Sequence, residues 1–233
     1  MPENSQEYGQ IDWVLASGSP RRQELLAAMG VPYRVLVPNV DEAALPGEGP
    51  AALAVRLSAA KAQAVADTLR VTGLRRSVVI AADTLVALDG EILGKPADGA
   101  EAQAMLGRLR GRVHRVYSGL ALLDLAGGRS GYHLAVTPVS MRAYGDDEIV
   151  AYVASGDPLD KAGAYAIQYR EFAPVDHVED CYANVMGLPM CHLYRQLRAW
   201  GLAVAHPQGI CPYVRAAGSC PWAQRITSGC SGA

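Results

Sequence analysis

A chain of 233 residues, half of them hydrophobic, is long enough for one large domain or for two lobes around a shared cleft. Its formal net charge of -2 argues against broad binding of nucleic acids, and no apolar stretch reaches the length that a membrane-spanning helix needs. Residues 1–10 are polar and acidic, unlike a signal peptide, and the five cysteines form no CxxC pair, so we expect a cytoplasmic protein with reduced thiols.

From residue 11 onward, the hydrophobic pattern alternates between short strands and helices. In chain order it predicts a strand over 11–17, a helix over 21–30, a strand over 32–40, a loop over 41–50, a helix over 51–69, a hairpin of strands over 77–88 and 91–96, a helix over 98–110, paired strands over 114–125 and 132–144, a helix over 146–155, a short strand over 162–168 and a turn leading into a final helix within 184–200. Because hairpins interrupt the alternation, the sheet should be mixed, in an α/β fold.

Both ends of the chain differ from this pattern. Residues 1–10 are expected to form a flexible leader. Residues 204–233 are rich in Gly, Pro, Cys and Ser and show no periodicity, so we expect a disordered tail and assign it no function.

An anion-binding candidate follows the first predicted strand. Residues 17–22 read Ser-Gly-Ser-Pro-Arg-Arg, so the strand ends in a glycine-containing turn and two arginines open the next helix. Backbone N–H groups at a helix start favour an anion, and the forked donors of Arg suit phosphate oxygens. Arg21 and Arg22 therefore either bind phosphate or are solvated side chains on a capped helix.

Two acidic positions are candidates for chemistry. Asp83 interrupts the continuous apolar run of residues 77–88, which indicates a strand buried on both faces. A buried carboxylate is costly without a partner, so Asp83 should be metal-bound, catalytic or paired with a buried cation. The Asp41-Glu42 pair lies in a loop, where it supplies metal ligands or simply forms an acidic turn.

The remaining polar candidates are ambiguous when each is considered alone. Thr84 follows Asp83 and is able to hydrogen-bond a ligand, although Thr is common in strands. Lys61 on the Ala-rich helix and Lys95 after the hairpin occupy positions where lysine is usually solvated. Gln168 can donate and accept together, as the reading of a base edge requires, although most Gln residues in strands read nothing.

Other catalytic motifs are weak in this sequence. The five His residues are scattered, and no HExxH motif occurs. Cys181, Cys191 and His192 suggest a thiol enzyme, but no base-orienting partner accompanies them. Cysteines in the hydrophobic core are therefore the better interpretation.

Taken together, these motifs resemble the Maf family, the septum-formation-inhibitor-like nucleotide pyrophosphatases. The resemblance extends over about residues 11–202, so we expect a Maf-like domain over residues 11–203. The order and spacing of seven blocks carry it: LASGSPRRQELL from Leu15, Asp41-Glu42, LSAAKA around Lys61, AADT with GKP, GRVHRVYSG from Gly111, DKAGAYAIQ from Asp160 and NVMGLP from Asn184.

The resemblance implies a fold, an activity and a set of site residues. Family enzymes are elongated, two-lobed α/β/α proteins, similar in architecture to inosine triphosphatases, that often form homodimers. They hydrolyse nucleoside triphosphates between the α- and β-phosphates with a divalent metal, commonly Mg²⁺ or Mn²⁺. Asp83 matches the proton acceptor, and Glu42 with Asp83 would hold the metal. The substrate-binding pattern falls on Ser17, Arg21, Arg22, Lys61, Thr84, Lys95 and Gln168, of which Arg21, Thr84 and Gln168 match specificity positions.

The family divides by substrate. The block DKAGAYAIQ and the Thr at position 84 are similar to the branch that acts on dTTP and UTP, whereas another branch prefers 7-methyl-GTP. Two departures, Tyr169 and Asp180, replace the family's usual glycines and put base selectivity in question. The competing class is a non-catalytic nucleotide-binding regulator of cell division, which would require the loss of the catalytic carboxylate or the lysines.

Overall fold

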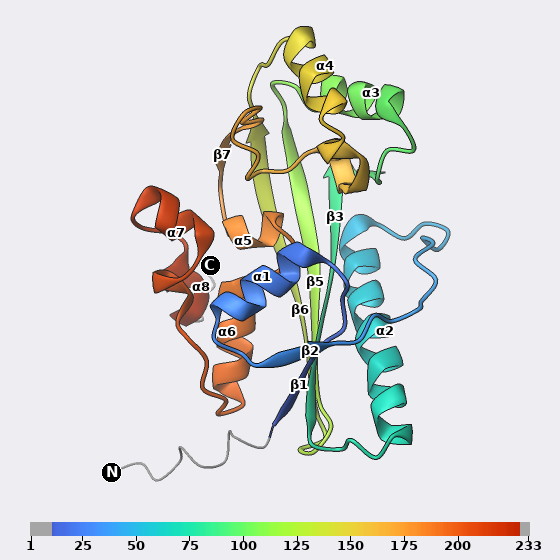
Figure 1. Ribbon diagram of the computed structural model, residues 1–233, viewed down its shortest axis with the longest axis vertical. Coiled ribbons are helices and arrows are strands. Elements are labelled where there is room, and N and C mark those ends of the chain that lie inside the picture. Colours follow the sequence, from blue (N-terminus) through green and yellow to red (C-terminus); the bar gives the residue numbers. More distant parts are fainter. Residues whose placement is uncertain (1–10, 229–233) are drawn as a thin grey trace.

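The computed structural model describes residues 11–228, without the side chains of residues 215–217 (Figure 1). Within these residues a seven-stranded sheet has the order β2-β1-β3-β5-β6-β7, with β4 paired to β3. β1 is parallel to β2 and β3, and the other pairs are antiparallel, so the predicted mixed sheet is confirmed. The strands are β1 (Asp12–Leu15), β2 (Tyr33–Val35), β3 (Ser77–Leu88), β4 (Glu91–Leu93), β5 (Val113–Asp124), β6 (Arg129–Met141) and β7 (Val175–Val178).

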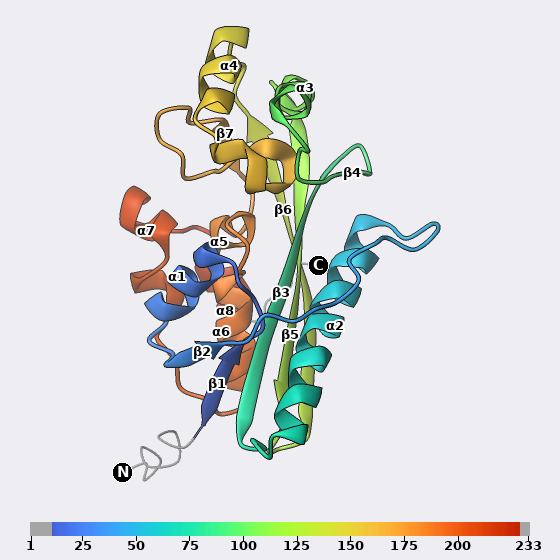
Figure 2. The same cartoon turned by 45° about the vertical axis from the view of Figure 1, so that its right-hand side comes forward.

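Helices cover both faces of this sheet, as the long apolar run of β3 predicts (Figures 1 and 2). On one face, Val79 and Ala81 of β3 pack in a core with α2 (Pro50–Val71). On the other face, Ile80 and Ala82 pack in a core with α1 (Pro20–Ala28) and α6 (Met190–Ala199). α5 (Tyr182–Val185) precedes α6 on that second face. Together these elements form the first lobe.

A second lobe lies at the other end of the long strands, where Figure 1 shows α3 and α4 at the top. It consists of α3 (Gly99–Leu109), α4 (Asp146–Ala154) and the 3-10 helices η2 (Asp157–Asp160) and η3 (Ala162–Ala164). These helices share an apolar core with the ends of β3, β5 and β6 that lie away from the first lobe. The molecule is therefore an elongated, two-lobed α/β protein.

A glycine sets the position of α2 on the sheet. Gly119 of β5 lies under the helix, and a Cβ atom there would overlap the backbone oxygen of Ala54. Any larger residue would push the helix away from the strand. Gly119 therefore allows α2, which carries Lys61, to lie close to β3 and β5.

The structure differs from the sequence prediction in the second lobe. Residues 162–168 do not form the predicted strand; they form η3 and a turn. Gly163 and Ala164 have φ angles of 71° and 58°, and this left-handed backbone does not continue a strand. The short edge strand β7 was not predicted, because its VDHV sequence gives only a weak hydrophobic signal.

The predicted disorder of the tail is also wrong for residues 204–228. These residues form η4 (Pro207–Gly209), α7 (Pro212–Ala217) and α8 (Ala223–Ser228), with Cys211, Ala223 and Ile226 buried. Helices of six residues are too short to show a clear period of 3.6, so composition suggested a loop. The predicted leader, residues 1–10, and the last five positions, 229–233, lie outside the described residues. Among the described helices, none combines the length and apolarity required to traverse a bilayer.

Candidate active site

A cleft of about 680 Å³ lies between the two lobes. Its lining joins the start of α1, the loop after β2, the middle of α2 and β3, the segment after β4 and the turn after η3. The sequence candidates therefore converge from distant parts of the chain. All nine of them line this cleft: Ser17, Arg21, Arg22, Glu42, Lys61, Asp83, Thr84, Lys95 and Gln168.

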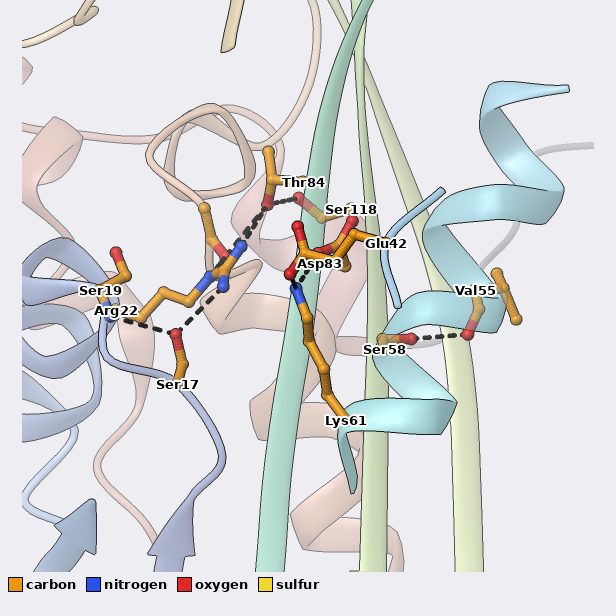
Figure 3. A network of polar contacts seen from close by, with 11 residues as sticks. Ser17, Ser19, Arg22, Glu42, Val55, Ser58, Lys61, Asp83, Thr84 and Ser118 are labelled. Carbon is orange, nitrogen blue, oxygen red and sulfur yellow. Dashed lines mark hydrogen bonds and ion pairs between the residues drawn. The ribbon is translucent and has the colours of Figure 1, made fainter. Parts of the chain in front are cut away.

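The ammonium group of Lys61 joins the two acidic candidates (Figure 3). Its Nζ lies 2.5 Å from Oδ1 of Asp83 and 2.6 Å from Oε1 of Glu42. Lys61 and Asp83 are both buried, whereas the Glu42 side chain is 62% exposed at the rim. The ion pair explains how β3 accommodates a carboxylate in its apolar run, because the charge is matched by a neighbouring cation.

Arg22 is fixed by three neutral oxygen acceptors (Figure 3). Nε donates to the backbone oxygen of Gly187 at 2.9 Å, and the two terminal nitrogens donate to Ser17 Oγ at 3.1 Å and Thr84 Oγ1 at 3.2 Å. Burial lowers the pKa of Arg22, and the negative charge of Asp83 partly opposes that shift. Because no carboxylate of residues 11–228 forms an ion pair with it, this guanidinium keeps its attraction for an anion in the cleft.

The hydroxyl of Thr84 has protein partners on several sides. It lies 2.7 Å from Ser118 Oγ and 3.3 Å from the backbone oxygen of Gly187, in addition to its contact with Arg22. Ser118 is fully buried on β5, directly opposite Thr84 in the β3–β5 register. Thr84 therefore orients Arg22 in this structure.

Three candidates extend from the rim of the cleft. Lys95 and Gln168 are exposed, and Arg21 is half-buried at the start of α1. Burial alone would raise the pKa of Asp160, but its hydrogen bond from Lys161 and the positive charge of Arg21 lower it overall. The positive charge of Arg21 in the first lobe thus acts on Asp160 in the second lobe.

Several residues of the site were not identified from the sequence. Lys161 is buried beside the cleft, where Nζ contacts Asp157 O and Asp160 Oδ1, both at 2.6 Å. Asn184, also buried, donates to the backbone oxygen of Val116 at 3.1 Å and ties α5 to the sheet. The available signal was their place in motif blocks: Lys161 in DKAGAYAIQ, and Asn184 with Gly187 in NVMGLP.

The donor set of the cleft fits a hard divalent cation. Glu42 and Asp83 approach the same nitrogen of Lys61, so their oxygens converge on one point. Mg²⁺ typically takes one or two carboxylates and completes its coordination with substrate phosphate oxygens and water. A metal in this cleft would be held by this pair, because among residues 11–228 no group of three or more His, Cys, Asp or Glu side chains is arranged for one.

The family model and the sequence relatives agree on one family. A dTTP/UTP pyrophosphatase from Geobacter metallireducens is 47% identical over 201 residues, covering 86% of this chain and 99% of that protein. The protein of the same name from Symbiobacterium thermophilum is 45% identical over 191 residues, covering 82% and 95%. Among solved structures, a HAM1 protein from Coxiella burnetii is 18% identical, with a TM-score of 0.40 over 70% of this chain and 89% of that one. The family model described as Maf-like protein matches residues 12–200, and the chain therefore belongs to the Maf-like family.

Proposed function

We propose that the protein is a nucleoside triphosphate pyrophosphatase that converts dTTP and UTP to the monophosphate and pyrophosphate. The observation that carries the proposal is the buried contact of 2.5 Å between Asp83 and Lys61, in a cleft that also holds Arg22. A carboxylate surrounded by cations suits hydrolysis of a polyphosphate. The relatives named dTTP/UTP pyrophosphatases support the substrate class.

The cationic and the acidic residues of the cleft would have different roles in the reaction. Arg22, Lys61 and Lys95 would hold the phosphate oxygens and stabilise the charge that develops as water attacks the α-phosphorus and pyrophosphate leaves. Asp83 is the buried carboxylate among the described cleft residues, and it would accept the proton of that water. A Mg²⁺ or Mn²⁺ held by Glu42 and Asp83 would add Lewis-acid stabilisation of the phosphate oxygens.

Base selection would depend on Gln168, with Arg21 and Thr84. The Gln168 amide can accept from N3–H and donate to O4 of thymine or uracil, and a site built on such bonds rejects bases that leave it unpaired. Tyr169 does not belong to the described lining of the cleft. The centroid of its ring lies 4.8 Å from that of Tyr152, a residue of the second-lobe core. Tyr169 would therefore not contact the base, and Gln168 would.

The enzyme would act in the cytoplasm, as a homodimer. The substrate would be a free nucleotide in the cytoplasm and not a nucleic acid, in keeping with the net charge of -2. A homodimer follows from the family resemblance, and sedimentation velocity of the purified protein tests it.

A pyrophosphate-release screen tests the activity. The purified protein is assayed against dTTP, UTP, CTP, GTP and 7-methyl-GTP, with Mg²⁺, with Mn²⁺ and with a chelator. We expect metal-dependent release with the highest kcat/KM for dTTP and UTP. A clear preference for 7-methyl-GTP would overturn the substrate branch, whereas nucleotide binding without release would favour a non-catalytic regulator.

A further inference from the structure

The C-terminal extension, residues 204–228, lies beyond the family match, which ends at residue 200. The match to the Geobacter metallireducens relative uses 99% of that protein but only 86% of this chain. The extension packs on the first lobe, because α7 contacts α5 and α8 contacts α6 (Figure 1). Its buried Cys211, Ala223 and Ile226 join the same apolar core as α1 and α6.

An ion pair links the extension to Asp180, which lies just before α5 in the chain. The guanidinium of Arg225 on α8 lies 2.8 Å from Oδ2 of Asp180. The other oxygen of Asp180 accepts the backbone N–H of Cys181, the residue immediately before α5, at 2.6 Å. Asp180 thus binds the extension with one oxygen and the start of the α5 segment with the other. The rings of Tyr182 and Tyr213 add a contact with centroids 5.3 Å apart.

The segment that receives these contacts continues directly into the active site. α5 has four residues, too few to be stable without tertiary contacts. Two residues after α5, the backbone oxygen of Gly187 accepts hydrogen bonds from Arg22 Nε at 2.9 Å and from the Thr84 hydroxyl at 3.3 Å. One short segment thus contacts the extension at Asp180 and orients the phosphate-binding arginine at Gly187.

We propose that the C-terminal extension positions Arg22, with Asp180 and Arg225 as positioning residues that act through α5 and Gly187. The inference rests on the proposed function for its kinetic consequence. Hydrogen bonds from the sheet hold the inner side of the segment, including Thr137 Oγ1 to Cys181 O at 3.2 Å. The extension covers the outer side, so its loss would let Gly187 move and would loosen the orientation of Arg22.

The kinetic test compares Arg225→Ala with Arg225→Lys and with Arg129→Ala. Arg129 is a matched control, because it pairs with a buried Asp124 at 2.6 Å and does not line the cleft. For Arg225→Ala we expect KM for dTTP to rise roughly three- to tenfold, with a smaller fall in kcat, since a loosened Arg22 weakens phosphate binding while Asp83 is untouched. Arg225→Lys should restore most of the KM, and Arg129→Ala should leave KM unchanged.

Hydrogen–deuterium exchange of the nucleotide-free protein gives a second test that is independent of activity. Arg225→Ala should speed exchange of the amides in residues 182–187, and Arg129→Ala should not. If the wild type releases no pyrophosphate, the proposed function fails while the exchange result still decides the coupling. Unchanged exchange and unchanged KM in Arg225→Ala, even with a lower melting temperature, would show that the extension only covers the core and would overturn the inference.

Discussion

The guanidinium of Arg22 donates a hydrogen bond of 2.9 Å to the backbone oxygen of Gly187, a residue 165 positions further along the chain. Gly187 has a φ angle of 112°, a conformation that residues with a side chain rarely adopt. A Cβ atom there would also lie 3.5 Å from Arg22 Nε. The glycine therefore lets the chain turn beside the arginine and present its oxygen.

Gly187→Ala should lower both stability and activity. The strained backbone should cost about 1–3 kcal/mol of unfolding free energy, and a shifted Arg22 should reduce kcat/KM for dTTP. Urea unfolding and steady-state kinetics measure the two effects. Gly73→Ala is the control: φ is 78°, and no atom lies within 4 Å of the added carbon, so it should lose stability without losing activity.

Asp83→Asn should abolish hydrolysis while the fold is retained. Asn keeps the shape of the side chain and can still accept from Lys61, but it is too weak a base to take a proton from water. The rate of pyrophosphate release should fall by about a hundredfold or more. Asp124→Asn, another buried Asp of the sheet but away from the cleft, should retain turnover. Near-normal turnover of Asp83→Asn would refute the assigned role.

Lys61→Met should leave the buried carboxylate of Asp83 without its cation. Breaking a buried ion pair typically costs about 3–5 kcal/mol, so the melting temperature in a chelator should fall markedly. Added Mg²⁺ should then stabilise Lys61→Met more than the wild type, since the metal would replace the missing charge. Equal stabilisation of both proteins by Mg²⁺ would contradict a metal at Glu42 and Asp83.

Gln168→Ala should lower kcat/KM for dTTP much more than for a poor purine substrate such as GTP. The amide matches the edge of thymine or uracil, so its removal should cost selectivity and spare the phosphate contacts. Competition between dTTP and GTP in one assay measures the ratio directly. A uniform loss on both nucleotides would show that Gln168 supports the fold of the turn and does not read the base.

Stability should fall as the pH drops below about 6.5. Burial lowers the pKa of His114 to about 4, whereas an unfolded His titrates near its ordinary value of 6.5. The unfolded chain therefore binds the extra proton between these values, and the stability that neutral His114 provides at higher pH is lost as the pH falls through this window.

His114→Gln checks this pH dependence. The amide can keep a contact like the one of 2.8 Å between His114 Nε2 and the Tyr165 hydroxyl, but it does not titrate. Between pH 6.5 and 5, the loss of unfolding free energy should be smaller than in the wild type by about 1.5 kcal/mol. Urea unfolding at several pH values gives the slope. Parallel slopes would show that other groups, such as buried His192, control the acid response.

Secondary structure was predicted correctly from the sequence where the hydrophobic pattern extended over a long segment. The strand over residues 77–88 matches β3 at both ends, and the helix over 51–69 lies within α2, because runs of this length carry a strong signal. Asp83 was recognised because a carboxylate in an apolar strand requires a partner. Its partner was not identified, since the burial of Lys61 depends on how closely α2 approaches β5 at Gly119.

Features that depend on tertiary contacts were not predictable from the sequence. The backbone oxygen of Gly187 accepts a hydrogen bond from Arg22 only because the fold brings α1 and α5 together. A contact to a backbone atom leaves no pattern in the side-chain sequence. The helices of the extension are short and stable only against α5 and α6, so their composition resembled that of a loop. Tyr169, which put base selectivity in question, is partly buried and packs against the second-lobe core.

The long strands of the sheet connect the two lobes rigidly. β3 and β5 have 12 residues each, and both contribute side chains to the apolar cores of the two lobes. Hinge motions require a few loop residues that absorb large backbone rotations, and a paired sheet provides none. The cleft between the lobes should thus have its width before a nucleotide binds. Any change of shape on binding would be confined to the loop over residues 36–49 and the turn that carries Gln168. A pocket of fixed width discriminates by size at little entropic cost, which suits an enzyme that must recognise a small base among larger ones.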